Sequence, residues 1–367
     1  MNYFHKRILF TALLCCVSLI TSCPSHTYIY SYEDLHGLLE DRVTLEEKEK
    51  IVIPFEANAE MKAFAMRISR SGQGTNSRCK RLVEGILNKS ELNVQYNKAL
   101  SKTAIDLFYE GEGNCLAYTN LFIALARSVG IRAFYVDASL LVSDVEEKEG
   151  MIVNNGHICA AVYAEPELLF IDFTKRVYKH IIGYKFIDDA EAIAHYYNNL
   201  GYEKRKVGQR KFSKAENMEG IDEFVMATKV CPDFYRAYNN LGVAYQQLGN
   251  FPKAIDYYKQ AIAINAEFAS AYSNLGMIFF STDDFTQAQK YFRKAIRYAK
   301  SNHYNYYYLG VIEMKKKNFK EAQKLLMKAC RIREDFSLAH LSLSQIYRQQ
   351  GDLEKADKEL EKARHKK

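Results

Sequence analysis

The 367-residue sequence contains no tryptophan and only five prolines. Proline disrupts helix interiors, so its scarcity leaves the chain free to form long helices. Apolar residues make up 48% and charged residues 26%, a balance that excludes a disordered chain and predicts a soluble, core-forming protein. No CxxC zinc pair, glycine-rich phosphate-binding loop or nucleic-acid-binding motif is present, so no metal, cofactor or nucleic acid is predicted.

Long hydrophobic runs are also scarce. A short basic start precedes the apolar run from Ile8 to Ile20, which is too short to span a bilayer as a mature helix. It predicts a secretory signal over residues 1–22, although an uncleaved anchor is the alternative. The following Thr-Ser-Cys23 resembles the lipobox of bacterial lipoproteins, which implies acylation of Cys23 and a lipid anchor outside the cytoplasm. Pro24 then favours the outer membrane, if the cell has one.

The sequence has eight cysteines, of which two leave with the signal and Cys23 is lipidated. The five that remain are Cys79, Cys115, Cys159, Cys231 and Cys330. An odd number in an exported chain points to a free, working thiol. Disulfides among the four cysteines other than Cys115 remain open.

From Tyr235 onward the sequence repeats itself every 34 residues. Three columns of small residues show the period: Gly242, Gly276, Gly310 and Ser344; Ala254, Ala288, Ala322 and Ala356; Ala261, Ala295, Ala329 and Ala363. Small residues let paired helices approach closely, and several units must stack to bury their apolar faces. The pattern resembles the tetratricopeptide repeat, with tyrosine at the usual tryptophan position. It predicts four units over residues 235–367, starting near 235, 269, 303 and 337.

A degenerate unit precedes them at residues 194–234. Tyr197 to Gly201 matches the opening of a repeat, and Phe224 with Ala227 matches its close. The distance between these halves is about seven residues too long. A basic insertion, Lys204 to Lys214, explains the difference.

In tetratricopeptide arrays the first helix of each unit lines a concave groove, and this resemblance implies a protein or peptide partner. The repeat register places these residues on the groove: Arg236, Asn239, Asn240, Gln246, Tyr304, Tyr307, Met314 and Arg348. Amide and tyrosine side chains suit an extended peptide. Ordinary packing within the array is the alternative, particularly for the tyrosines.

The middle of the chain has a different pattern. Apolar residues at three- and four-residue spacing predict helices across residues 31–110. Between Arg132 and Lys175 the period shortens to strand-like runs, separated by polar stretches such as Ser143 to Gly156. We therefore expect a linker and lead-in helix over residues 23–54 and an α+β domain over residues 55–190.

Cys115 begins the central helix of this domain, directly after Gly113 and Asn114. Unpaired backbone N–H groups and the helix dipole at such a position favour a thiolate. His157 opens a later strand and Asp172 lies in the next, an order that suits a hairpin placing the carboxylate beside the imidazole. Cysteine as nucleophile, histidine as base and aspartate as orienter form a catalytic arrangement.

The Gly-Asn-Cys115 segment, Ala124-Leu-Ala-Arg127, His157 and Asp172-Phe-Thr174 together resemble the transglutaminase-like superfamily. The resemblance covers roughly residues 55–180. It implies a papain-like α+β fold and acyl transfer or amide hydrolysis through a thioester on Cys115. The chain lacks the tryptophan that many members place near the catalytic residues, so the backbone N–H of Cys115 and the side chain of Asn114 are the oxyanion candidates.

The sequence thus predicts an α+β transglutaminase-like domain followed by an all-α tetratricopeptide solenoid, tethered to the bacterial cell envelope. The first functional hypothesis is a thiol amide hydrolase or acyltransferase whose repeats recruit a protein or peptide. The alternative is a catalytically inert adaptor that acts through the repeats alone.

Overall fold

The computed structural model describes residues 28–48, 51–70, 72–138, 145–148, 151–154, 157–164, 167–173, 184–208 and 218–364. The predicted signal peptide and Cys23 lie outside this set, as does part of the basic insertion. No helix within the described ranges has the length and apolar character needed to cross a membrane.

The N-terminal half begins with helices, as the apolar spacing predicts. Their bounds are α2 Tyr32–Glu40, α3 Leu45–Lys48, α4 Ala59–Ser69, α5 Gly74–Leu87, α6 Ala104–Glu110 and α7 Cys115–Ser128. Two short parallel strands, β1 Gln95–Tyr96 and β2 Glu112–Gly113, pair just ahead of α7. Helices α4, α5 and α6 all pack against α7, which places α7 at the centre of this part of the fold.

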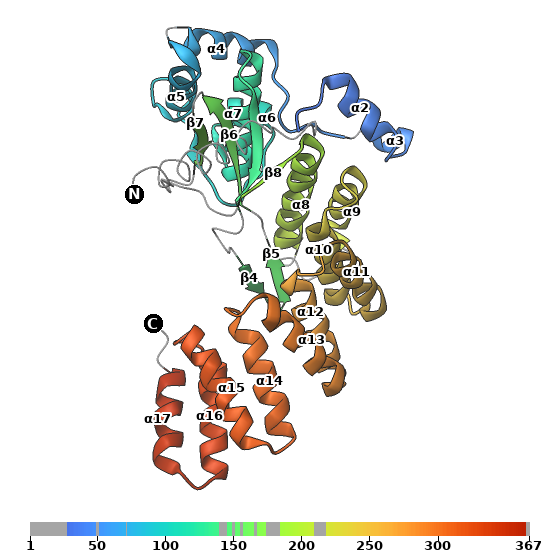
Figure 1. Ribbon diagram of the computed structural model, residues 1–367, viewed down its shortest axis with the longest axis vertical. Helices are drawn as coiled ribbons and strands as arrows, with labels where there is room; N and C mark the ends of the chain where they lie inside the picture. The colour runs from blue at the N-terminus through green and yellow to red at the C-terminus, as the bar shows by residue number, and fades with distance from the viewer. Residues whose placement is uncertain are drawn as a thin grey trace, which may run out of the picture.

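An antiparallel sheet in the order β7-β6-β3-β8 lies against α7 (Figure 1). Its strands are β3 Ala133–Asp137, β6 Ile158–Ala164, β7 Glu167–Ile171 and β8 Lys185–Ile187. In β6, six of the seven residues are buried, since strand β6 lies in the interior of the sheet and against α7. The α+β class predicted from the sequence is confirmed.

The sequence predicts the polar stretch from Ser143 to Gly156 as a connection between strands, and here the structure differs. It contains a further antiparallel hairpin, β4 Val145–Lys148 and β5 Met151–Asn154. Strand β5 lies against two helices of the C-terminal half, α10 Tyr235–Gln247 and α12 Ala269–Ser281 (Figure 1). Two four-residue strands are too short to give a clear period-two pattern in the sequence.

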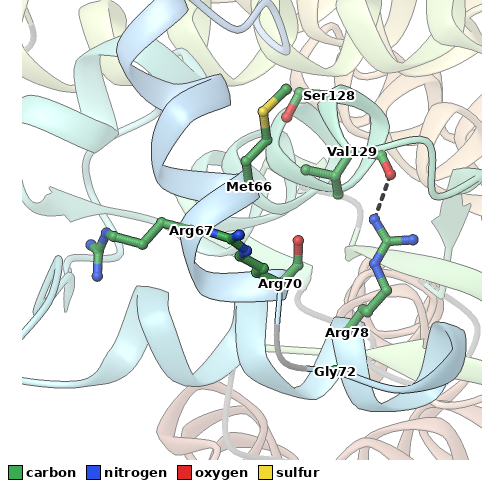
Figure 2. A pocket seen from close by; sticks show the side chains of 8 residues that line it. Met66, Arg67, Arg70, Gly72, Arg78, Ser128 and Val129 are labelled. Carbon is green, nitrogen blue, oxygen red and sulfur yellow. Dashed lines mark hydrogen bonds between the residues drawn. The ribbon is translucent and has the colours of Figure 1, made fainter.

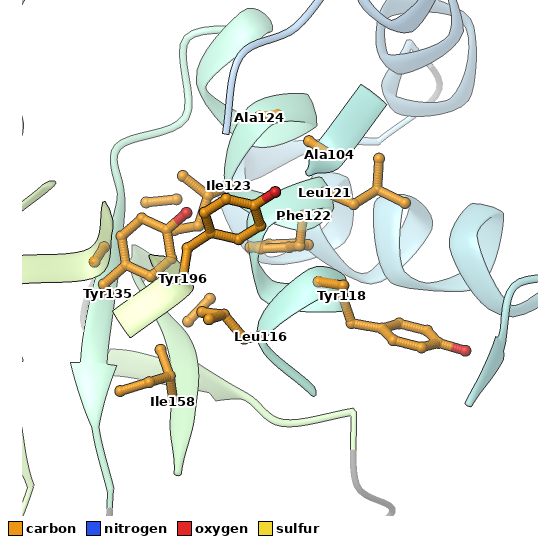
Figure 3. Packing of buried hydrophobic residues seen from close by; sticks show 14 of the residues in the cluster. Ala104, Leu116, Tyr118, Leu121, Phe122, Ile123, Ala124, Tyr135, Ile158 and Tyr196 are labelled. Carbon is orange, nitrogen blue, oxygen red and sulfur yellow. The ribbon is translucent and has the colours of Figure 1, made fainter. Parts of the chain in front are cut away.

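Helix α7 is surrounded by apolar side chains, and Figure 3 shows this packing around Leu116, Phe122 and Ile123. Eleven consecutive residues of α7, from Leu116 to Ala126, are buried. A helix that is apolar on every side has to sit in the interior of a domain. Its position is therefore fixed on all sides, and so is the position of the residue at its N-terminus.

The C-terminal half is an array of helical hairpins. The helices are α10 Tyr235–Gln247, α11 Phe251–Ile264, α12 Ala269–Ser281, α13 Phe285–Tyr298, α14 His303–Lys315, α15 Phe319–Ile332, α16 Ser337–Gln349 and α17 Leu353–Arg364. The first helix of each pair begins where the 34-residue sequence period begins. At the crossing point in the first pair, a β-carbon on Gly242 would lie 2.5 Å from the ring of Tyr258. The absence of a side chain at this position allows the two helices to meet.

The region predicted as a degenerate repeat forms the helices α8 Asp189–Gly208 and α9 Ile221–Val230, which pack against each other. A β-carbon on Gly201 would lie 2.8 Å from the ring of Phe224, the same kind of crossing as in the regular units. Gly242 and Tyr258 are 16 positions apart, whereas Gly201 and Phe224 are 23 positions apart. The pair therefore has repeat-like packing with seven additional residues between its crossing positions.

Candidate active site

Cys115 is the first residue of α7, and its side chain is half-buried. Gly113 precedes it in a confined space, where a β-carbon would lie 2.8 Å from that of Ala117 and 2.9 Å from Leu107. Asn114 caps the helix by accepting a hydrogen bond from the backbone N–H of Ala117 at 3.0 Å. In the first turn of a helix the N–H groups lack acceptors inside the helix, and the dipole favours negative charge there. Cys115 thus stands at the positive end of the helix dipole.

His157 and Asp172 come together at one edge of the sheet. His157 immediately precedes β6 and Asp172 immediately follows β7, and the two strands are antiparallel neighbours. The His157 carbonyl also accepts a hydrogen bond from the backbone N–H of Ala138 at 2.8 Å. Asp172 Oδ2 lies 2.9 Å from His157 Nε2, and both side chains are 5% exposed. Strand order therefore brings imidazole and carboxylate together, as the sequence predicts.

Cys115 lies within hydrogen-bonding reach of His157, which completes the convergence of the three predicted residues. Burial lowers the pKa of His157, but hydrogen bonds to Asp172 and Cys115, with their Coulombic attraction, outweigh it and raise the pKa to about 10. The imidazole therefore has both a carboxylate, next to Nε2, and the thiol as partners. This arrangement can take a proton from the thiol and hold the resulting imidazolium.

The other four cysteines in the described ranges are free thiols in a different environment. Burial raises the pKa of Cys79 and of Cys330 to about 11, and that of Cys159 and of Cys231 to about 12. Cys159 is two positions from His157 along β6, yet its side chain is 1% exposed. Deprotonating a buried thiol is costly, so none of the four has the setting of a nucleophile.

The side chain of Asn114 does not act as the predicted oxyanion donor, because its polar atoms bind other groups. Its amide nitrogen donates to Ser101 Oγ at 2.7 Å and lies 3.5 Å from Glu203 Oε1. Its oxygen is used in the helix cap, and the residue is 6% exposed. The side chain is therefore held inside the fold, and the backbone N–H of Cys115 is the oxyanion candidate that keeps its place beside the thiol.

Ser101 and Glu203 contact the site as well, although the sequence did not predict them. Glu203 comes from α8, 88 positions after Cys115, and no motif includes it. Its carboxylate accepts hydrogen bonds from the backbone N–H of Ser101 at 2.8 and 3.1 Å and from Ser101 Oγ at 2.6 Å. A contact between residues this far apart leaves no trace in local spacing.

The predicted groove residues on α10 are used inside the molecule. Arg236 is 5% exposed and donates to Asp137 Oδ2, at the end of β3, at 2.8 Å. Asn239 and Asn240 are buried, and Asn240 donates to Asn198 Oδ1 of α8 at 2.8 Å. This differs from the prediction of an open groove, because α10 packs against α8 and strand β5 of the N-terminal half.

The remaining groove residues are spread along the array. Gln246 is half-buried and accepts a hydrogen bond from the Tyr258 hydroxyl. On α14, Tyr304 and Tyr307 pack edge-on against Phe336, and Met314 is half-buried.

Arg348 on α16 is largely exposed and pairs with Asp357. Leu338 and Leu341 on α16 are 45% and 39% exposed. They occupy the register positions of Tyr304 and Tyr307 one repeat later, a signal that the 34-residue period already contains.

A surface hollow of about 790 Å³ lies elsewhere, and Figure 2 shows Arg67, Arg70, Arg78, Ser128 and Val129 around it. It faces the C-terminal end of α7, roughly 20 Å from Cys115 at the helix rise of 1.5 Å per residue. Arg78 donates to the Val129 carbonyl at 2.6 Å, and Arg67 forms an ion pair with Glu91. The hollow is therefore separate from the site of Cys115, His157 and Asp172. Within the described ranges, no three His, Cys, Asp or Glu side chains are grouped as metal ligands.

Comparisons with known proteins agree with this division. Residues 62–171 match the transglutaminase-like superfamily, and residues 235–268, 269–302, 303–336 and 338–363 each match a tetratricopeptide repeat. A search among curated proteins gave no match.

Among solved structures, a crystal structure of MamA shares 25% identity, covering 43% of this chain and 92% of that one, with a TM-score of 0.37. YrrB, described as a tetratricopeptide protein with an unusual peptide-binding site, shares 18% identity over 46% of this chain and 84% of its own, with a TM-score of 0.37. PilF of Pseudomonas aeruginosa shares 14% over 47% of this chain and 79% of its own, with a TM-score of 0.40. The chain combines a transglutaminase-like domain with tetratricopeptide repeats.

Proposed function

We propose that this protein is a lipid-anchored thiol amide hydrolase or acyltransferase of the bacterial cell envelope, with a repeat array that binds a protein or peptide partner. The observation that carries the proposal is the convergence of Cys115, His157 and Asp172 at the N-terminus of α7. His157 and Asp172 are 42 and 57 positions from Cys115 in the sequence, yet all three lie at one site. Each of the three side chains has an ionisable neighbour there. Ionisable groups that are perturbed by burial and by a specific charge partner are candidates for a functional site.

The reaction follows from these groups. His157 already holds the proton of the thiol, and the Cys115 sulfur attacks the carbonyl carbon of an amide. When the C–N bond breaks, His157 returns the proton to the leaving amine and a thioester remains on Cys115. Water or a second amine then attacks the thioester and gives its proton to His157, and the thiol is regenerated. Asp172 keeps the imidazole oriented and stabilises its charged form throughout.

Alkylation of the cysteines by iodoacetamide tests this proposal without knowledge of the substrate. At neutral pH, Cys115 should react at least about ten-fold faster than Cys79 or Cys159, because those two thiols have pKa values of about 11 and 12. Mass spectrometry of peptides gives each rate in one sample, so the buried cysteines are internal controls. His157→Gln should slow Cys115 selectively. Equal, slow rates at all sites would support the inert adaptor instead.

The partner surface belongs to the part of the array farthest from the catalytic domain. The α10 end is covered, whereas α16 exposes Leu338 and Leu341 beside the half-buried tyrosines of α14. Exposed apolar groups next to aromatic rings suit the side chains of a bound peptide. A photocrosslinking residue in place of Leu341 should capture the partner, and one in place of Leu353, which is exposed on α17, should not. Equal capture at both positions would contradict this assignment.

The lipid anchor rests on the sequence around Cys23, which lies outside the described residues. Acylation at this cysteine would hold the catalytic and repeat domains outside the cytoplasm. Cys23→Ser should abolish fatty-acid incorporation and release the protein from membranes. A variant that stayed membrane-bound with fatty acid attached would contradict the assignment.

A further inference from the structure

Helix α8 belongs to both halves of the molecule. Its first half contributes Ile193 and Tyr196 to the core that surrounds α7. Its second half contains Gly201, which packs against Phe224 in the first repeat-like hairpin. Any side chain on α8 that reaches the catalytic site therefore links that site to the start of the repeat array.

Glu203 is such a side chain. Its carboxylate oxygens accept three hydrogen bonds from Ser101, two from the backbone N–H and one from the hydroxyl. Ser101 Oγ in turn accepts from the Asn114 amide at 2.7 Å, and the Asn114 oxygen accepts from the Ala117 N–H. The series runs without a break from α8 to the first turn of the helix that begins with Cys115.

The chemistry of this series favours a rigid arrangement. Hydrogen bonds to a carboxylate are shorter and stronger than those between neutral groups. Ser101 and Asn114 are both buried, so without Glu203 the Ser101 N–H loses the acceptor that this series provides. Asn114 would then cap α7 less firmly, and the N–H groups around the thiol would be less well ordered.

We propose that Glu203 is a positioning residue for the nucleophile: acting through Ser101 and Asn114, it fixes the N-terminus of α7 and connects the thiol to the first helix of the repeat array. This inference rests on the proposed function, since it assigns Glu203 a role in the reactivity of Cys115. Glu203 acts here as a hydrogen-bond acceptor. Its negative charge has the opposite effect on a thiolate, and the two effects can be separated by substitution.

The test is the rate of Cys115 alkylation by iodoacetamide in the full chain, measured from pH 5 to pH 9. Glu203→Ala should slow the reaction at pH 7 about three- to ten-fold, the range expected for a weakened helix cap. Glu203→Gln should recover most of the rate, because its amide oxygen can still accept from Ser101. Lys204→Ala is the matched control: this neighbour on α8 pairs with Glu223, away from Ser101, and its substitution should leave the rate unchanged.

Ser101→Ala interrupts the same series from the other side and should also slow Cys115. The double variant should be no slower than the slower single variant, because both substitutions break one path. If Glu203→Ala does not fold, as judged by its thermal unfolding, Ser101→Ala and Glu203→Gln decide the question.

The proposal is overturned if folded Glu203→Ala keeps the alkylation rate of the unsubstituted protein, or reacts faster. It is also overturned if the Gln variant is as slow as the Ala variant, since charge would then be the active property. Failure of the proposed function has a different signature. In that case Cys115 of the unsubstituted protein would react no faster than Cys79.

Discussion

Replacing Asp172 by asparagine isolates the source of the charge on His157. Burial alone lowers the pKa of this histidine, and contacts with Asp172 and Cys115 raise it to about 10. Compared with the ordinary value of 6.5, this corresponds to a preference for the imidazolium on the order of 5 kcal/mol. Asp172→Asn keeps the shape of the partner but removes its charge, so the pKa of His157 should fall.

Histidine-selective NMR measures this change directly. The chain has nine histidines, and the resonance lost in His157→Gln identifies the relevant one. In the unsubstituted protein this imidazole should stay protonated beyond pH 8, whereas in Asp172→Asn it should titrate at a lower pH. A titration midpoint of the His157 imidazole near 6.5 in the unsubstituted protein would refute the assigned role of Asp172. So would a midpoint that stayed the same in Asp172→Asn.

The same substitution should also change how the free energy of unfolding depends on pH. A folded-state pKa raised above the unfolded value stabilises the fold fully below pH 6.5, and this contribution is lost as pH rises through about 10. The unfolding free energy of Asp172→Asn should therefore fall furthest below that of the unsubstituted protein near pH 6. The difference in unfolding free energy between the two proteins should become smaller toward pH 10. A gap that widened with pH would contradict the assigned protonation.

Two further predictions concern the scaffold. Gly276→Ala places a β-carbon 2.7 Å from a ring on α13 and should lower the free energy of unfolding by about 1–3 kcal/mol in urea titrations, whereas Gly37→Ala, with open space around it, should not destabilise. Arg127→Met leaves the Asp189 carboxylate, 1% exposed, without its bidentate partner and should cost about 3–5 kcal/mol. Arg67→Met, which breaks an exposed pair, should cost much less; similar losses for the two arginines would contradict this reasoning.

The regular parts of the fold were predictable because they repeat a short-range rule. A 34-residue period, with glycine or serine at one column, locates the helical hairpins from Tyr235 onward. One strand-like run begins at His157 and the next ends at Asp172, which is enough to infer a hairpin. Antiparallel pairing then places these two residues at the same end of the sheet. In these regions, the contacts in the fold follow directly from the local pattern of the sequence.

Other features depend on contacts that no local pattern encodes. Asn114 has the residue type of an oxyanion donor, but Ser101 and Glu203 occupy its amide. Arg236 has the register of a groove residue, but Asp137 of β3 forms an ion pair with it. In both cases the sequence defines the position along the helix, whereas a distant segment decides what the side chain does.

The predicted boundary between domains, near residues 190–194, falls within helix α8. Residues on both sides of that boundary, Ala190 and Tyr197, belong to one apolar core, and so does Ala237 in the first regular repeat. A shared core of this kind restrains relative motion of the two halves far more than a flexible linker does. A partner held on α14 and α16 would therefore lie at a position set by the scaffold relative to Cys115. In such an arrangement the repeats not only capture a partner but also determine which of its segments can reach the thiol.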